Sequence, residues 1–243
     1  ETVYGLAADA SNETAVRRIF AAKGRPADHP LIVHVAAAEQ ITAWSDGVPP
    51  AAATLAGLCW PGPLTLLVPR AAHVLDVVTG GRSTVGVRVP AHPLTTDLLS
   101  RFAALPGRRV AGLAAPSANR FGRVSPTTAA HVVADLGAAV DLVLDGGACP
   151  VGVESTIVDC SVSPPQVLRP GGIATEEIER VLGGQVAPAS GPSRAAGMMA
   201  SHYAPDCPVR LADDPADANR LAAEQRAPLV VGVDVDDVTY AQH

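Results

Sequence analysis

The first candidate residue for binding an anion in this chain is its single lysine. Lys23 is the only lysine among the 18 lysine and arginine residues, and it stands in the segment Lys23-Gly24-Arg25-Pro26. A lysine ammonium is a compact point charge, whereas the arginine guanidinium is a planar fork, so one lysine in an arginine-rich chain indicates a site that needs the ammonium. Lys23 and Arg25 together suit a phosphate group. The alternative is a solvated helix end, where the helix dipole favours cations.

A second polar segment follows the apolar stretch at residues 110–114. It contains Ser117 and Asn119. Small hydroxyl and amide side chains at a strand end commonly line a ligand site, although a polar surface turn would have the same composition. Further groups that could bind an anion come directly after it, namely Arg120, Arg123 and Ser125.

A glycine-containing segment leads into Glu154-Ser155-Thr156, with Gly146, Gly147 and Gly152 before it. A Walker-type phosphate loop needs lysine and then serine or threonine after its last glycine, and it opens a helix. Here Val153 and Glu154 follow Gly152, and the next residues predict a strand. It remains possible that backbone N–H groups of this segment bind an anion together with the Ser155 hydroxyl.

The seven histidines and four cysteines show no spacing typical of a metal site. Extended backbone would place His29 and His34, five residues apart, on opposite faces, so we expect no metal held by protein ligands. His34 lies in an apolar segment, where a histidine is more often a hydrogen-bonded core residue than a catalyst. The cysteines are expected to be reduced thiols of a cytoplasmic protein: Cys59, Cys149, Cys160 and Cys207.

The composition excludes several classes of protein. Hydrophobic residues make up 48% and charged residues 17% of the chain, which excludes a disordered chain. The net charge is -6, and residues 206–243 carry an excess of acidic residues. We therefore do not expect binding of duplex nucleic acid to be the main role of this protein. The uncharged run at residues 47–69 contains several prolines that would break a membrane-spanning helix.

Hydrophobic spacing and turn residues predict many short elements, since 22 glycines and 22 prolines are spread along the chain. Helices and strands are mixed without strict alternation, which predicts an α/β fold with a twisted, mixed sheet flanked by helices. Residues 1–6 read as the end of a strand. Helices are predicted at residues 14–20, 51–59, 94–105, 127–136 and 175–182, with Ser125 or Pro126 near the start of the fourth. Strands are predicted at residues 31–35, 64–68, 84–89, 110–114, 140–144, 156–159 and 166–168.

The chain is predicted to have two domains. Residues 1–183 form the larger one, and residues 184–207, rich in alanine, proline, serine and glycine, form a linker. Residues 208–243 show a β-α-β pattern with a helix near residues 215–225, but so short a segment cannot bury a full core. We therefore expect the second domain to be incomplete here. Because the sequence has no initiator methionine and residues 1–6 read as the end of a strand, we also expect the natural protein to extend further at its N-terminus.

Seven segments in this order resemble the YrdC-like domain of threonylcarbamoyl-AMP synthases, over about residues 1–205. The linker of the longer, two-domain form is similar to two further segments, Gly197-Met198 and Ser201-His202-Tyr203-Ala204-Pro205. The seven segments are Glu1-Thr2-Val3-Tyr4-Gly5-Leu6, Lys23-Gly24-Arg25-Pro26 with Pro30-Leu31-Ile32-Val33-His34, Trp60-Pro61-Gly62-Pro63-Leu64-Thr65, Val87-Arg88-Val89-Pro90, Pro116-Ser117-Ala118-Asn119, Glu154-Ser155-Thr156-Ile157-Val158-Asp159 and Arg169-Pro170-Gly171.

The resemblance implies a reaction and a set of site residues. L-threonine, bicarbonate and ATP, with Mg²⁺, would give threonylcarbamoyl-AMP and pyrophosphate, and downstream transferase proteins would use the product to modify tRNA. Lys23 and Arg25 would be catalytic. The residues implied to hold threonine are Thr2, His34, Arg88 and Ser155. Those implied to hold ATP are Lys23, Arg25, His29, Ser117, Asn119, Ser125, Arg169 and Tyr203, although the family often has asparagine where His29 stands.

Two other functions stay open at this point. The first is a non-catalytic RNA-binding module of the same fold. The near-balanced charge of residues 1–205 weighs against it, because binding to the phosphates of RNA favours a positively charged surface. The second is a carbamoyl-transfer domain of a hydrogenase-maturation protein, which would carry zinc-finger and acylphosphatase segments that this sequence does not show.

Overall fold

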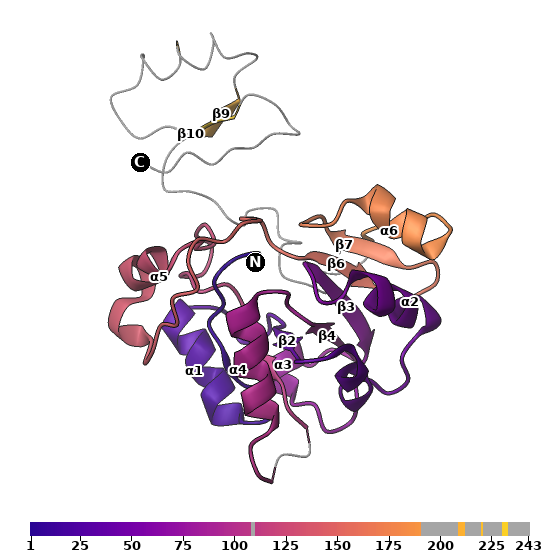
Figure 1. Ribbon diagram of the computed structural model, residues 1–243, viewed down its shortest axis with the longest axis horizontal. Coiled ribbons are helices and arrows are strands. Elements are labelled where there is room, and N and C mark those ends of the chain that lie inside the picture. Colours follow the sequence, from indigo (N-terminus) through magenta and orange to yellow (C-terminus); the bar gives the residue numbers. More distant parts are fainter. Residues whose placement is uncertain (108–109, 191–208, 212–219, 221–229, 233–243) are drawn as a thin grey trace. The chain divides into compact units, whose positions relative to one another are not determined.

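The structure is a computed structural model that describes residues 1–107, 110–190, 209–211, 220 and 230–232. Its contacts divide the chain into two units, one of Glu1–Phe121 with Ser125–His202 and one of Gly122–Val124 with Tyr203–His243. Figure 1 labels the helices α1–α6, which belong to the first unit. Their bounds are α1 (Glu13–Lys23), α2 (Pro50–Cys59), α3 (Asp76–Thr79), α4 (Pro93–Ala103), α5 (Ala129–Leu136) and α6 (Thr175–Leu182), with short 3-10 helices η1 (Ala38–Ala43) and η2 (Gly137–Ala139).

The first unit is built on a mixed sheet, as the sequence predicts. Its strands run in the order β1-β5-β2-β4-β3-β6-β7-β8. Pairing is parallel between β2 and β4, β3 and β6, and β7 and β8, and antiparallel at the other junctions. The strands are β1 (Ala8–Asp9), β2 (Ile32–His34), β3 (Leu64–Pro69), β4 (Thr84–Arg88), β5 (Leu113–Ala114), β6 (Thr156–Asp159), β7 (Gln166–Arg169) and β8 (Ala187–Pro188).

The two faces of this sheet differ in chemistry because side chains alternate along each strand. One face carries the main apolar core, in which α1, α2, α3 and α6 bury their apolar sides. The other face carries a small apolar cluster of Leu67, Ile157 and Leu168 with Ile32. In β3, Leu64 and Leu66 join the main core, so Thr65 faces the opposite way. Polar side chains therefore gather on the second face of the sheet.

The ends of α1 show how local sequence positions the site. Asn12 caps the helix, and its side chain accepts a hydrogen bond from the Ala15 N–H at 3.1 Å. Gly24 ends the helix in the left-handed conformation at φ 62°, which glycine adopts without strain. The last helical residue, Lys23, is therefore held at a fixed point, and its side chain turns into the protein with 3% of the residue exposed.

Several sequence expectations need correction. Residues 140–144 form no strand; Leu142 is 73% exposed, while Val140 and Val143 pack beside α5. The apolar alternation there has no neighbouring strand to pair with. Residues 1–6 contain only an isolated bridge from Gly5 to Ser117. Further differences are the short strand β5 in place of residues 110–114 and a cap at Thr128 in place of Ser125 or Pro126. The strands β1 and β8, the short helix α3 and the 3-10 helices η1 and η2 were not predicted.

β8 lies within residues 184–207, where the sequence predicts a linker, and it extends the sheet beside β7. The predicted domain boundaries themselves stay a prediction. The described part of the second unit holds the parallel pair β9 (Val209–Leu211) and β10 (Val230–Gly232). Parallel pairing agrees with the predicted β-α-β pattern. Of the helix predicted at residues 215–225 only Arg220 is described, and it is helical. Among the described residues, no helix is both long and apolar enough to span a membrane.

Candidate active site

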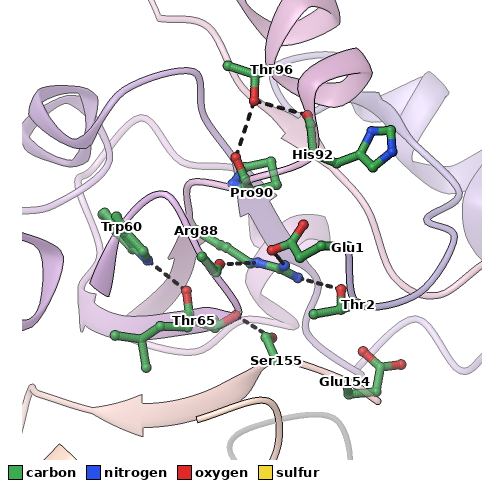
Figure 2. A network of polar contacts seen from close by, with 12 residues as sticks. Glu1, Thr2, Trp60, Thr65, Arg88, Pro90, His92, Thr96, Glu154 and Ser155 are labelled. Carbon is green, nitrogen blue, oxygen red and sulfur yellow. Dashed lines mark hydrogen bonds and ion pairs between the residues drawn. The ribbon is translucent and has the colours of Figure 1, made fainter. Parts of the chain in front are cut away.

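A buried arginine at the end of β4 is the centre of the first polar group. Arg88 is 5% exposed, and its Nη1 donates to Thr2 Oγ1 at 2.9 Å while its Nε donates to the Gly62 carbonyl at 3.0 Å. Its Nη2 forms an ion pair with the Glu1 carboxylate (Figure 2). Burial lowers the pKa of Arg88, and the neighbouring carboxylates of Glu1 and Glu154 oppose that shift. The guanidinium is thus fixed in orientation by three groups.

Ser155 lies beside Arg88 on the same face of the sheet. Its Oγ is 2.7 Å from Thr65 Oγ1, and Arg169 Nη2 donates to Ser155 Oγ at 3.1 Å and to its carbonyl at 2.8 Å. The backbone turn that holds Ser155 packs against Gly171, where a Cβ atom would come within 2.6 Å of the Ser155 carbonyl carbon. Only glycine allows this approach. The Ser155 hydroxyl is therefore positioned by two side chains and by a tight backbone contact.

His34 is the neighbour of Arg88 across the parallel pair of β2 and β4. Burial and the adjacent Arg88 charge lower the pKa of His34 to about 3, so the imidazole is neutral at neutral pH. Its Nδ1 is buried and has no hydrogen-bond partner among the described residues. A buried imidazole without a partner at one nitrogen is suited to bind a ligand group. The four residues predicted to hold threonine thus lie together.

Lys23 is the centre of the second polar group. Its ammonium donates to the carbonyls of Ser117, at 2.5 Å, and of Asn119. Burial and the charge of Arg25 lower the pKa of Lys23 to about 7, while Glu154 opposes that shift. These contacts tie the C-terminal end of α1 to the loop after β5. The predicted segments around Lys23 and Ser117 therefore meet in space.

Arg25 and His29 both contact the aromatic ring of Phe121. Arg25 Nη2 donates to the Pro30 carbonyl at 2.9 Å, and its guanidinium carbon is 6.0 Å from the centroid of the Phe121 ring. The His29 ring meets the edge of the same ring, with centroids 5.2 Å apart. Partial burial and the charge of Arg25 lower the pKa of His29. A flat ring beside two cationic or polar side chains is suited to contact a nucleotide.

Glu154 interacts electrostatically with both polar groups. Its carboxylate accepts a hydrogen bond from Ser125 Oγ at 2.8 Å and lies 3.6 Å from Arg169 Nη2. The negative charge of Glu154 opposes the lowering of the pKa of both Lys23 and Arg88. The segment that carries Glu1 and Thr2 pairs at Gly5 with Ser117, whose carbonyl accepts from Lys23, so the two polar groups lie on neighbouring segments. Tyr203 is outside the described residues.

Sequence reasoning missed three residues of this region. Glu1, Thr65 and Glu154 each stand in a segment that carries the family resemblance, but none was assigned a role. Adjacency along the chain to Thr2 and Ser155 is the signal that could have drawn attention to Glu1 and Glu154. Nothing comparable marks Thr65, whose importance depends on the pairing of β3 with β6.

The fold and the site define a YrdC-like α/β protein, and two family models match the chain. Residues 1–171 match the Sua5_yciO_yrdC family model, described as "Telomere recombination", and residues 173–237 match Sua5_C, "Threonylcarbamoyl-AMP synthase, C-terminal domain". The chain belongs to the Sua5/YciO/YrdC family. The predicted family and fold class are thereby confirmed.

The chain is similar to curated proteins named threonylcarbamoyl-AMP synthase. It is 46% identical over 231 residues to one from Pyrococcus abyssi (strain GE5 / Orsay), covering 93% of this chain and 66% of that protein. It is 43% identical over 219 residues to one from Bacillus subtilis (strain 168), covering 88% of this chain and 61% of that protein. The chain therefore spans slightly less than two thirds of the length of these relatives.

Solved structures show the same fold. The crystal structure of P. abyssi Sua5 complexed with L-threonine matches with a TM-score of 0.81 and 44% identity, covering 92% of this chain and 66% of that one. The crystal structure of E. coli YciO matches with a TM-score of 0.61 over 73% of this chain and 84% of that one. Its identity is only 20%, so that likeness concerns the fold alone.

Proposed function

We propose that this chain is the catalytic part of an L-threonylcarbamoyladenylate synthase. The reaction would convert L-threonine, bicarbonate and ATP into threonylcarbamoyl-AMP and pyrophosphate. The observation that carries the proposal is that the polar groups around Arg88 and around Lys23 lie on neighbouring segments, because the segment that carries Glu1 and Thr2 pairs at Gly5 with Ser117, whose carbonyl accepts from Lys23. The curated relatives named for this product, and the relative solved with L-threonine, support the assignment.

L-threonine would bind at the group around Arg88. The guanidinium suits the substrate carboxylate, which arginine binds in a bidentate fork. Thr2 and Ser155 offer hydroxyl groups, and neutral His34 offers an imidazole nitrogen that has no partner among the described residues. These neutral groups suit the side-chain hydroxyl of threonine without adding charge.

ATP would bind at the group around Lys23. Lys23 and Arg25 would contact the phosphates as catalytic residues, and Arg169 would contribute a further cation. The backbone carbonyls of Ser117 and Asn119 accept from Lys23, which places these two residues beside it, and His29 lies beside the Phe121 ring. Ser125 stays a predicted contact of the nucleotide. Tyr203 stays a predicted contact.

The chemistry needs positioning more than a protein base. The amine of threonine attacks the carbon of bicarbonate, and a carbamate forms with loss of water. A carbamate oxygen then attacks the α-phosphorus of ATP in line, the bond to the β-phosphate oxygen breaks, and pyrophosphate leaves with that electron pair. Cations placed where charge develops stabilise such a transfer. Lys23, Arg25 and Arg169 would supply these cations, and Arg88 would hold the attacking molecule in place.

Mg²⁺ would enter as part of the nucleotide substrate. Among the described residues there is no group of three or more His, Cys, Asp or Glu side chains that could hold a metal by itself. Mg²⁺ usually takes one or two carboxylates and completes its shell with phosphate oxygens and water. We expect the phosphate oxygens of ATP and water to supply most of that shell here. We place the reaction in the cytoplasm, where tRNA-modifying transferases would take up the product.

The proposal is tested by incubating the protein with ATP, Mg²⁺ and labelled bicarbonate, with and without L-threonine. We expect release of pyrophosphate that depends on threonine, together with label in a nucleotide product. Equal release with and without threonine would contradict the proposal. RNA binding without any labelled product would instead favour a non-catalytic module of the same fold.

A further inference from the structure

Two opposite charges lie in direct contact inside the site. The carboxylate of Glu1 pairs with the guanidinium of Arg88, and only 11% and 6% of the two side chains are exposed. A buried ion pair costs desolvation and contributes little net stability. A role in recognising a charged ligand therefore accounts for the pair better than stability does.

Both partners keep hydrogen-bonding capacity for a ligand. A guanidinium has five N–H groups, and the contacts of Arg88 with Gly62, Thr2 and Glu1 use one on each nitrogen. Each terminal nitrogen therefore retains a second N–H. Only Oε1 of Glu1 contacts Arg88 among the described residues, and Figure 2 shows the other carboxylate oxygen turned away from the guanidinium. A ligand that brings both an acceptor and a donor would satisfy both groups.

An α-amino acid has that pair of groups, because its carboxylate and its ammonium are attached to one carbon atom. We propose that Glu1 receives the α-ammonium of the substrate while Arg88 receives its carboxylate, so that the pair selects α-amino acids over carboxylic acids that lack the amino group. This inference rests on the proposed function and adds a specificity-determining residue to it.

The surroundings of the pair leave few other receptors for an ammonium. His34 is neutral, since the pKa of its imidazole is lowered to about 3 by burial and by Arg88. Thr2 and Ser155 offer uncharged hydroxyls. Glu154 is the other carboxylate, but its oxygens already contact Ser125 Oγ and face Arg169 Nη2. Removing the charge of Glu154 therefore tests whether the ammonium needs Glu1 itself or only a carboxylate nearby.

The test measures binding by titration calorimetry at neutral pH with two ligands. One is L-threonine, and the other is the dihydroxybutanoate analogue of threonine, in which a hydroxyl replaces the α-ammonium. The proteins are the wild type, Glu1→Gln, Glu1→Asp and Glu154→Gln. Glutamine keeps an oxygen to accept from Arg88 but removes the charge, and aspartate restores the charge.

We expect the wild type to prefer L-threonine over the analogue. Glu1→Gln should weaken threonine binding by about 10-fold to 100-fold, leave the analogue unchanged or tighter, and so abolish the preference. Glu1→Asp should restore part of it, and Glu154→Gln should keep it. Equal weakening of both ligands in Glu1→Gln would show that Glu1 only orients Arg88, and a preference lost in Glu154→Gln instead would assign the ammonium to Glu154; either result overturns the inference.

The same titration separates this inference from the proposed function. If the wild type binds threonine and Glu1→Gln keeps the preference, the inference fails while the proposed substrate stands. If the wild type binds a different α-amino acid and Glu1→Gln loses the preference for it over its hydroxy acid, the inference holds and the proposed substrate is wrong. If the wild type binds no α-amino acid, both are overturned.

Discussion

At the scale of single residues, burial decides what the charged groups of the site can do. Lys23 and Arg88 are 3% and 5% exposed, so each meets its partners away from bulk water. Electrostatic contacts in such places are stronger than on the surface, and leaving one partner without the other is costly. The sequence around Lys23 and the family resemblance at Arg88 drew attention to these two residues, but neither assigned a role to Glu1, which pairs with Arg88.

The first prediction concerns Arg88. Arg88→Ala should remove the receptor for the threonine carboxylate and leave Glu1 buried without its partner. We expect kcat/KM for threonine to fall by the equivalent of about 2–4 kcal/mol, with little change in KM for ATP. Steady-state kinetics with each substrate varied in turn measures this.

The matched control is Arg101→Ala, which removes an exposed helical ion pair with Asp97 and should change neither constant appreciably. A loss of ATP affinity alone in Arg88→Ala would show that the residue has been given the wrong role.

The second prediction concerns the proton on Lys23. The folded protein releases it near pH 7, since burial and Arg25 lower that pKa from 10.5 to about 7. The unfolded state keeps the proton up to the higher value, so it binds more protons between the two pKa values. The free energy of unfolding should therefore rise with pH across that interval. Denaturant unfolding of the wild type and Lys23→Met at several pH values measures the contribution of Lys23.

The rise with pH should be smaller in Lys23→Met, because methionine fills the same space without titrating. Parallel pH profiles for the two proteins would mean that the pKa of Lys23 is not lowered in the folded state.

At the scale of elements, the periodicity of apolar residues predicted most helices and central strands. The strands β3, β4 and β6 begin within a residue of their predicted positions, because each alternates between the main core and the second face. The sequence misplaced the segment at residues 140–144, whose apolar pattern has no partner strand. Short edge strands such as β1 and β8 depend on neighbours distant in the sequence, so local patterns cannot reveal them.

The third prediction concerns the tight approach of two loops. In Gly171→Ala the new Cβ would come within 2.3 Å of the Glu154 carbonyl oxygen and 2.6 Å of the Thr156 nitrogen. The backbone that presents Ser155 and Glu154 must shift, so we expect a loss of about 1–3 kcal/mol in stability and weaker binding of both substrates. Thermal unfolding and substrate titration measure the two effects.

Gly57→Ala is the matched control, because Gly57 is exposed in α2 and its Cβ would meet nothing within 4 Å. It should stabilise the protein by about 0.5–1 kcal/mol. An unchanged stability and unchanged binding in Gly171→Ala would refute the close packing of these loops.

At the scale of the whole molecule, the unequal faces of the sheet separate stability from function. The helices α1, α2, α3 and α6 pack on one face, and the groups around Arg88 and Ser155 lie on the other. The order of predicted helices and strands, mixed without strict alternation, predicted an α/β protein with a mixed sheet. The strand order depends on pairings between distant segments that no local pattern encodes. The family resemblance predicted site residues whose roles stay predictions, whereas their contacts with one another required the structure.

The fourth prediction tests this separation on α2. Leu55 is fully buried in the main core and Leu58 is 70% exposed on the same helix. Leu55→Ala should cost about 2–5 kcal/mol of stability, while Leu58→Ala should stay within about 0.5 kcal/mol of the wild type. Chemical denaturation measures both. Below the unfolding transition the threonine affinity of Leu55→Ala should equal that of the wild type, and an altered affinity would mean that the two faces are coupled.

The central claim is that one region of the first unit brings an amino acid and a nucleotide into contact. A crystal structure of the protein with L-threonine and a non-hydrolysable ATP analogue tests it most directly. The account predicts the threonine carboxylate on Arg88 and the phosphates beside Lys23, Ser117 and Asn119, with the threonine amine facing the α-phosphate. Ligands bound at separate places, or phosphates that contact neither Lys23 nor Arg25, would contradict it.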